Sequence, residues 1–399
     1  MRILLPTGSA TVEIVKAVAE RFRDRYTIDV VVTGEIASFL TPGVLRRLLA
    51  GGNYDMAIVS GMCTASFADV ERETGVPVYR GPRHAADLPI VLSVLDHVTL
   101  SKTVPADEFL AETRREEACR QVALREVEAD ADFVIRGVKI GGNSRMKVLA
   151  EIMDAHRRDD LVFEVERFFA DGADIVDLGF GFDATPDDVK RVFSVLEGID
   201  GPLAVDTQDP RLIAAALFRA DLVLSLHEEN IPAVGKAVAD AGAAAVVVPR
   251  ERTLEENIAA AREAGISRLI ADPLLQPVGS GLVDSLANFK AAPRPLFFGA
   301  GNVVELMDAD SPGANALLAG MAHEVGAAVV FTSEHSDKTR GSVAEMRRAT
   351  EMVALMTGRP YPKDLGLDLL ILKEKRRRRE PPLAYESIVD AHPAPDEIV

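Results

Sequence analysis

The sequence has few cysteines and no long hydrophobic run, and each absence excludes a class of protein. Its cysteines, Cys63 and Cys119, have neither zinc-ligand nor CxxC spacing, so a disulfide framework or a structural zinc site is not expected. No stretch approaches the roughly 18 consecutive apolar residues that a membrane-spanning helix needs. The first residues also lack the apolar region and cleavage site of a signal peptide. We therefore expect a cytoplasmic protein that is not bound to a membrane.

The sequence also has fewer cationic than acidic residues. The 399 residues include 45 Lys and Arg against 62 Asp and Glu, which gives a formal net charge of −17. This balance argues against nucleic-acid binding, because such binding needs a basic surface that neutralises phosphates. It also means that an anionic substrate would need a local cluster of cationic residues. The length predicts two or three domains, or one large barrel with an additional domain.

Several well-known catalytic motifs are absent. The sequence contains neither GxGxxG nor GxxxxGK[ST], so a dinucleotide-binding or P-loop protein is not indicated. It also lacks the HExxH pair of zinc hydrolases and the GxSxG turn of serine hydrolases. Any chemistry must therefore depend on residues that are distributed over several elements.

Residues 1–101 alternate short apolar runs with helical patterns. Strict alternation of strand and helix predicts βαβ units and a parallel sheet, hence a small Rossmann-like α/β domain. Three expected strands end in a hydroxyl-glycine pair, at 7–8, 33–34 and 60–61. These turns either serve as tight turns and caps, or the backbone of residues 8–11 binds an anion at a helix start. Residues 102–131 are highly charged and favour a connecting helix.

From residue 132 to about 358, eight candidate strands alternate with helical patterns. This arrangement predicts an α/β fold whose C-terminal part is a (β/α)8 TIM barrel; the alternative is a doubly wound open sheet. We expect the first strand in FVIRGVKIG (133–141) and a helix in SRMKVLAEIMDAHRR (144–158). In a barrel the functional residues follow the strands at one mouth.

Acidic side chains occur at or just after several of these strands. Asp177, Asp206 and Asp272 each belong to such a strand end. A carboxylate in a partly dry barrel mouth can accept hydrogen bonds from the N–H and amino groups of a heterocycle. Alternatively, Asp206 caps the following helix. Asp272 is less suited to that role, because the next residue is proline and has no backbone N–H.

Cationic residues are expected to gather where the first and last barrel strands meet. There Lys139 and Arg145 would approach His335, Lys338 and Arg340, forming a patch for a phosphate or diphosphate. The alternative is that these side chains are solvated loop charges that pair with neighbouring acidic residues.

Three segments together resemble a known family. DGADIVDLGFGF (171–182), PLAVDTQDPRLIAAAL (202–217) and RLIADP (268–273) are similar in order and spacing to the pterin-binding family, which comprises dihydropteroate synthases and folate- or corrinoid-linked methyltransferases. The resemblance covers about half of the chain. With the extra N-terminal domain, the chain looks most like the dihydropteroate synthase-related proteins of archaea and bacteria that use tetrahydromethanopterin.

The resemblance implies roles for particular residues. Asp206 and Asp272 match the carboxylates that bind the pyrimidine edge of the pterin, and Asp177 lines the same pocket. Ser225 stands where the family has a pterin-binding Asn. Asn143 stands for the strand-one Asn that helps to hold Mg²⁺ and diphosphate. The family's NVTPDSF loop is absent, its SRK is replaced by residues 301–303, and its RVH by FTSEH (331–335).

The implied activity is a transferase reaction of tetrahydromethanopterin-type cofactor synthesis. It joins a dihydropterin-methyl diphosphate to an arylamine, such as a ribosyl-aminobenzene phosphate, and needs no protein nucleophile. The alternatives are a non-synthase pterin-binding or methyl-transfer protein of one-carbon metabolism, and a barrel enzyme acting on another phosphorylated heterocycle. We expect a homodimer. The extension over 359–399 carries a basic tract, KEKRRRRE (373–380), which we expect to lie against an acidic protein surface rather than on nucleic acid.

Overall fold

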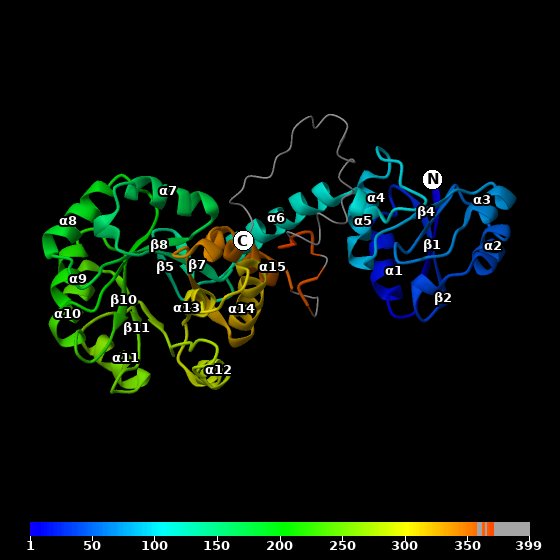
Figure 1. The fold of residues 1–399 in the computed structure, drawn as a ribbon. Helices are drawn as coiled ribbons and strands as arrows, with labels where there is room; N and C mark the ends of the chain where they lie inside the picture. Colours follow the sequence, from blue (N-terminus) through cyan, green and yellow to red (C-terminus); the bar gives the residue numbers. More distant parts are fainter. Residues whose placement is uncertain (357–360, 364, 371–399) are drawn as a thin grey trace, which may run out of the picture.

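The protein is described by a computed structural model that covers residues 1–356, 361–363 and 365–370 (Figure 1). The basic tract over 373–380 and most of the expected extension over 359–399 lie outside the described residues. None of the described helices combines the length and the hydropathy needed to cross a membrane. The expected homodimer and the cytoplasmic location stay predictions.

The first hundred residues form a four-stranded parallel sheet with the strand order β2-β1-β3-β4. Alternate residues of β1 point to opposite faces: Ile3 and Leu5 pack with α1 and α4, whereas Leu4 packs with α2 and α3. Both faces are therefore covered by helices, as is usual for a parallel sheet. The elements are β1 (Arg2–Gly8), α1 (Val12–Arg21), β2 (Thr27–Gly34), η1 (Ala37–Phe39), α2 (Pro42–Ala50), β3 (Met56–Val59), α3 (Ala68–Thr74), β4 (Val78–Arg80), η2 (Ala85–Asp87) and α4 (Leu88–Val94).

Helix α6 leads from this sheet to the second part of the chain (Figure 1). It spans Ala111–Glu128 and is preceded by the single turn α5 (Ala106–Phe109). Its buried residues Ala118 and Val122 pack against Leu355 and Leu367. The guanidinium of Arg125 also donates a hydrogen bond to the carbonyl of Ala354, at 2.6 Å. The charged connecting helix is thus attached to the end of the barrel domain.

The second part is a closed barrel of eight parallel strands, which confirms the expected α/β barrel. Strand β14 pairs with β7 and so closes the ring. The strands are β7 (Lys147–Ile152), β8 (Ile175–Gly179), β9 (Leu203–Asp206), β10 (Leu222–Leu226), β11 (Ala244–Val247), β12 (Leu269–Ala271), β13 (Leu296–Phe298) and β14 (Ala327–Ser333). The helices are η3 (Ala155–Arg157), α7 (Leu161–Asp171), α8 (Pro186–Val195), α9 (Pro210–Ala216), α10 (Ile231–Ala241), α11 (Leu254–Glu263), α12 (Leu282–Ala291), α13 (Ala300–Glu305), α14 (Ser311–Val325), η4 (Asp337–Thr339) and α15 (Ser342–Ala354).

The first barrel strand is not the one expected from the sequence. Residues 133–141 form an antiparallel hairpin, β5 (Phe133–Ile135) and β6 (Val138–Ile140), which turns at Arg136 and Gly137, both with positive φ. Such a two-residue turn is typical of a hairpin. The first barrel strand is instead β7, within the segment for which a helix was expected. That prediction was wrong because burial on both faces of the sheet overrides the helix propensity of Lys, Leu, Ala and Glu.

The hairpin closes the end of the barrel from which the strands start. Its Ile135 and Ile140 pack with Leu149, Ile175 and other inward-facing residues of the strands. The outward-facing residues of the same strands, such as Val148 and Val176, pack with the surrounding helices. Because side chains alternate along a strand, the next inward positions after this apolar layer are 151, 177 and 206. These positions lie at the opposite mouth of the barrel, at the carboxyl ends of the strands.

Candidate functional site

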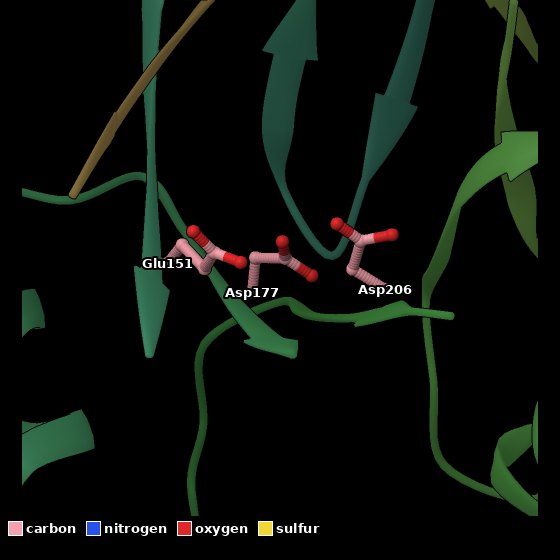
Figure 2. A group of neighbouring side chains, drawn as sticks. All are labelled: Glu151, Asp177 and Asp206. Atoms are coloured by element: carbon pink, nitrogen blue, oxygen red, sulfur yellow. The ribbon is translucent and has the colours of Figure 1, made fainter. Parts of the chain in front are cut away.

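Three carboxylates from three neighbouring strands meet at the carboxyl-end mouth of the barrel. Glu151 comes from β7, Asp177 from β8 and Asp206 from β9, and one oxygen atom from each can be chosen so that all three lie within 4.8 Å of one another. The strand register pairs Glu151 with Asp177 and Gly179 with Asp206. Figure 2 shows Asp177 between the other two side chains. The fold thus holds three acidic groups in one layer of the barrel.

Burial makes this cluster electrostatically unfavourable when it is fully ionised. Asp177 is 0% exposed, and neither of its carboxylate oxygens has a hydrogen-bond partner. Burial, with the nearby charges of Asp206, Glu305 and Asp154, raises the pKa of Glu151 to about 7. Burial raises the pKa of Asp206 to about 6. Burial, and then the charges of Asp206 and Glu151, raise the pKa of Asp177 well above its usual range.

A fourth carboxyl group, that of Asp272, follows β12. In the ring of strands, β12 is separated from β9 by β10 and β11, so Asp272 lies on a different arc of the mouth from Asp206. Asp272 is buried and accepts a hydrogen bond from the backbone N–H of Leu274, at 2.8 Å. Burial raises the pKa of Asp272 to about 7, although that hydrogen bond opposes the shift. No described Lys, Arg or His forms an ion pair with Asp206 or Asp272.

A cleft with a volume of about 260 Å³ opens beside Glu151 and Asp206. The loop after β8 forms one wall. At Gly179, the last residue of β8, a Cβ atom would lie 3.0 Å from the Glu151 Oε1 atom, so that the Glu151 carboxylate would have to shift. Phe182 stands fully exposed on the same loop and lines the cleft. The lining contains four carboxylates but no Lys, Arg or His; it consists of Glu151, Met153, Asp154, residues 179–182, residues 206–209 and Leu212.

Glu305, at the end of α13, organises the loop after β14. Its carboxylate accepts hydrogen bonds from the hydroxyls of Ser333, Ser336 and Thr339 and from the backbone N–H of His335, at 2.7–3.2 Å. Burial alone would raise the pKa of Glu305, but these hydrogen bonds, with those of Ser336 and Thr339 largest, lower it. Glu305 therefore stays ionised and adds negative charge near Glu151.

The structure separates the cationic residues that the sequence was expected to bring together. Lys139 and Arg145 precede β7 and lie at the closed end of the barrel, whereas His335, Lys338 and Arg340 follow β14 at the mouth. The ammonium of Lys139 donates to the carbonyl of Ala129 at 2.7 Å, and to two further carbonyls at the end of α6. The prediction of one shared cationic patch was wrong because it rested on the wrong first strand.

Two of the other predicted phosphate and metal residues, Asn143 and Lys338, have partners elsewhere. The side-chain oxygen of Asn143 accepts a hydrogen bond from the backbone N–H of Asp130, at 2.6 Å, so it does not fit a Mg²⁺ site at the mouth. Lys338 forms an ion pair with Asp308 at 3.1 Å. Arg340 is exposed. Thus the residues expected to bind diphosphate do not form one site.

Ser225 lies in β10, next to Asp206 in the barrel. Its neighbour Leu224 pairs with Asp206 in the strand register. Ser225 has a φ of 63°, which is in the left-handed region, and the register of β10 shifts there. Two of the predicted pterin residues, Asp177 and Asp206, are therefore in direct proximity, Ser225 is on the adjacent strand, and Asp272 is further round the ring.

Four residues of this region were missed by the reasoning from sequence: Glu151, Asp154, Phe182 and Glu305. The first two were missed because 144–158 was read as a helix. KVLAEI is buried at nearly every position and therefore lacks the polar and apolar alternation that would have indicated a strand. Phe182 and Glu305 belong to a loop and a helix whose contacts depend on the closed barrel, so no local pattern indicated them.

A second cavity, of about 240 Å³, lies at the carboxyl edge of the N-terminal sheet. Its walls are mainly apolar and include Leu5, Ile58 and Leu88. The hydroxyls of Thr7 and Thr11 are 3.0 Å apart at its edge. The cavity lies beside the turn for which anion binding was one alternative, and the predominantly apolar lining offers little support for that alternative.

The raised pKa of Asp272 predicts a pH dependence of stability. An aspartate in an unfolded chain has a pKa of about 3.9, against about 7 for Asp272 in the folded chain. Between these values the folded chain binds the extra proton, so stability falls as pH rises, by at most about 1.4 kcal/mol per pH unit. Asp272→Asn should remove this contribution. Urea denaturation followed by circular dichroism should therefore give a weaker loss of stability for the variant than for the wild type across this window. An equal dependence of stability on pH in the two proteins would contradict the raised pKa of Asp272.

The fold and the site define an α/β barrel protein with a carboxylate-lined mouth. The chain is 33% identical to the uncharacterized protein MJ0107 of Methanocaldococcus jannaschii, over 95% of this chain and 79% of that protein, and belongs to the same family. No family model matches the sequence.

Several solved structures, among them dihydropteroate synthases, are also similar to the chain. The enzyme of Yersinia pestis with a pterine-sulfa conjugate is 20% identical, with a TM-score of 0.46, over 57% of this chain and 98% of that one. Rv1207 of Mycobacterium tuberculosis is 24% identical, with a TM-score of 0.44, over 57% of this chain and 100% of that one. The Thermus thermophilus enzyme in complex with 6HMPPP is 21% identical, with a TM-score of 0.43, over 52% of this chain and 93% of that one.

Proposed function

We propose that this protein is a transferase that joins a dihydropterin-methyl diphosphate to an arylamine and releases diphosphate. The observation that carries the proposal is a pair of carboxyl groups without a cationic partner among the described residues, the half-buried one of Asp206 and the buried one of Asp272, on separate arcs of one barrel mouth. A buried carboxyl group without a cationic partner is costly unless a ligand or a proton compensates it. A pterin ring, with its N–H and amino groups, supplies such donors.

The sequence context supports a pterin over other heterocycles. Asp206 belongs to the AVDT motif and Asp272 to the ADP motif, and both occur in the order typical of the pterin-binding family. Phe182 offers an exposed aromatic face beside the cleft, on which a flat ring can stack. We assign the arylamine to the ribosyl-aminobenzene phosphate type, as in tetrahydromethanopterin synthesis.

The reaction requires positioning rather than a protein nucleophile. The arylamine nitrogen attacks the methylene carbon, a C–N bond forms, and the C–O bond to diphosphate breaks with its electron pair passing to the leaving group. The arylammonium proton is then lost to water. Holding the two reactants in line can supply much of the rate enhancement. The carboxyl groups of Asp206 and Asp272 hold the pterin ring for this attack.

One observation favours a second candidate, a pterin-binding or methyl-transfer protein without synthase activity. The cleft lining contains no Lys, Arg or His that could stabilise a departing diphosphate. A methylated or reduced pterin without phosphate groups would not need such a residue. The two candidates therefore differ in whether diphosphate is released.

Incubation of the purified full-length protein with 6-hydroxymethyl-dihydropterin diphosphate and an arylamine tests the proposal. The arylamines are p-aminobenzoate and ribosyl-aminobenzene phosphate, and Mg²⁺ is present. We expect release of diphosphate and a product whose mass equals that of the joined fragments. Pterin binding without diphosphate release with either arylamine would overturn the synthase proposal in favour of the second candidate. Absence of pterin binding would overturn both.

A further inference from the structure

We propose that Glu151, Asp177 and Asp206 bind one divalent cation, Mg²⁺ or Mn²⁺, at the barrel mouth. One oxygen atom from each carboxylate lies within 4.8 Å of the others. Oxygen ligands at 2.0–2.1 Å in an octahedron are about 3 Å apart when adjacent and about 4 Å apart when opposite. Small side-chain rotations would therefore bring the three oxygens to one ion.

Asp177 is the observation that distinguishes this cluster from an ordinary group of acidic residues. Its side chain is completely buried, and both of its oxygens lack a hydrogen-bond partner. It points between Glu151 and Asp206 (Figure 2). A buried ionised carboxylate without a partner costs several kcal/mol. None of the ion pairs among the described residues involves these three carboxylates. A cation between them would satisfy all three groups.

The ligand set selects the kind of ion. All three ligands are carboxylates, and the set contains neither His nor Cys. Carboxylate and water ligands suit Mg²⁺, Mn²⁺ and Ca²⁺ rather than Zn²⁺ or Cu²⁺. Because all three residues come from adjacent paired strands, the site is held rigidly by the barrel. A Cβ atom at Gly179 would lie 3.0 Å from the Glu151 Oε1 atom and would displace that carboxylate by a few tenths of an ångström.

The cation would also explain how an anionic group can enter this cleft. The lining includes four carboxylates, those of Glu151, Asp154, Asp206 and Asp209, and lacks cationic side chains. A bound divalent ion with open coordination positions toward the cleft would accept an oxygen of the diphosphate; this role rests on the proposed function. Asp206 can serve both ligands, because one carboxylate oxygen can bind the ion while the other accepts from a heterocycle.

Direct titration of the full-length protein with Mn²⁺ tests the site without any pterin. The protein is first freed of metal with EDTA and dialysed, and unbound Mn²⁺ is measured by electron paramagnetic resonance. We expect one Mn²⁺ per chain, displaced by Mg²⁺. Asp177→Asn and, independently, Glu151→Gln should weaken binding by roughly 10–100-fold or more, since a displaced ligand costs at least as much as a displaced supporting residue.

The matched control is Asp187→Asn, an exposed carboxylate in the first turn of α8 that pairs with Lys190. It should bind Mn²⁺ like the wild type. Thermal melting shows whether each variant is folded. Mg²⁺ should raise the melting temperature of the wild type and of Asp187→Asn, but not of Asp177→Asn.

The proposal is overturned if the wild type binds no Mn²⁺, or if Asp177→Asn and Glu151→Gln bind it as the wild type does. Stoichiometric Mn²⁺ binding without diphosphate release would remove the proposed function and leave the metal site. Diphosphate release by a wild-type protein that binds no Mn²⁺ would remove the metal site and leave the proposed function.

Discussion

Replacing Arg145 with methionine should lower the free energy of unfolding by about 3–5 kcal/mol, the usual cost of breaking a buried ion pair. The guanidinium of Arg145 is 5% exposed and lies 2.5 Å from the carboxylate of Asp174. It also donates to the carbonyl of Met146 and to the hydroxyl of Thr350. Without Arg145, the one cationic partner that Asp174 keeps among the described residues is Arg347, at 3.2 Å.

The loss should be concentrated at the closed end of the barrel. Asp174 precedes β8, and its carboxylate accepts from the backbone N–H of Val148 in β7. Burial opposes ionisation of Asp174, but the charges of Arg145 and Arg347 lower its pKa. Removing Arg145 therefore leaves a buried negative charge that is less well compensated, next to the first strand pair of the barrel. Urea denaturation followed by circular dichroism measures the change, since the chain has no tryptophan for fluorescence.

The control for this prediction is Arg120→Met on α6. Arg120 forms a similar ion pair with Glu117, at 2.7 Å, but its side chain is 62% exposed. Exposed pairs contribute about 0–1 kcal/mol, so this variant should unfold almost like the wild type. Equal effects of both substitutions would contradict the assignment of Arg145 to the core of the closed end. If Arg145→Met lost diphosphate binding but kept its stability, Arg145 would belong to the ligand site that was expected from the sequence.

The position of Arg145 illustrates what local patterns could and could not predict. Alternating strands and helices correctly indicated a closed eight-stranded barrel. The segment over 144–158 contains helix-favouring residues, and only its place between two paired strands makes β7 extended. The local indication of a hairpin in 133–141 was Gly137, because a two-residue hairpin turn needs the positive φ that Arg136 and Gly137 adopt in the structure.

The acidic residues of the mouth were more accessible to prediction than the cationic ones. Asp177 and Asp206 lie at the ends of strands with strong apolar patterns and Asp272 directly follows such a strand, so their positions relative to the strand ends could be predicted. The expected positions of Lys139 and Arg145 depended on which segment forms the first strand. Because the wrong segment was taken as that strand, both residues were expected at the mouth and not at the closed end. Whether a carboxylate is buried without a partner, as Asp177 is, depends on all the strands around it and has no local signature.

Asp272→Asn should weaken the binding of a dihydropterin by about 10–100-fold, which corresponds to about 1–3 kcal/mol for a lost hydrogen bond to a charged group. Asparagine is nearly isosteric and can still accept the hydrogen bond from the Leu274 N–H. It replaces one carboxylate oxygen with an NH₂ group, which cannot accept from the heterocycle. Calorimetric titration with 6-hydroxymethyl-dihydropterin, which carries no diphosphate, measures this effect apart from any bound cation.

The same substitution separates a binding role from a structural one, because the two roles predict opposite signs. Above its pKa of about 7 the carboxylate of Asp272 is ionised, buried and without a cationic partner among the described residues, so at pH 8 its replacement should leave the protein at least as stable as the wild type. Weaker pterin binding in a protein of undiminished stability can then arise only from the lost acceptor. Asp308→Asn, at an exposed carboxylate near the same mouth, should bind the pterin normally. Unchanged affinity in Asp272→Asn, or equal losses in both variants, would remove Asp272 from the pterin site.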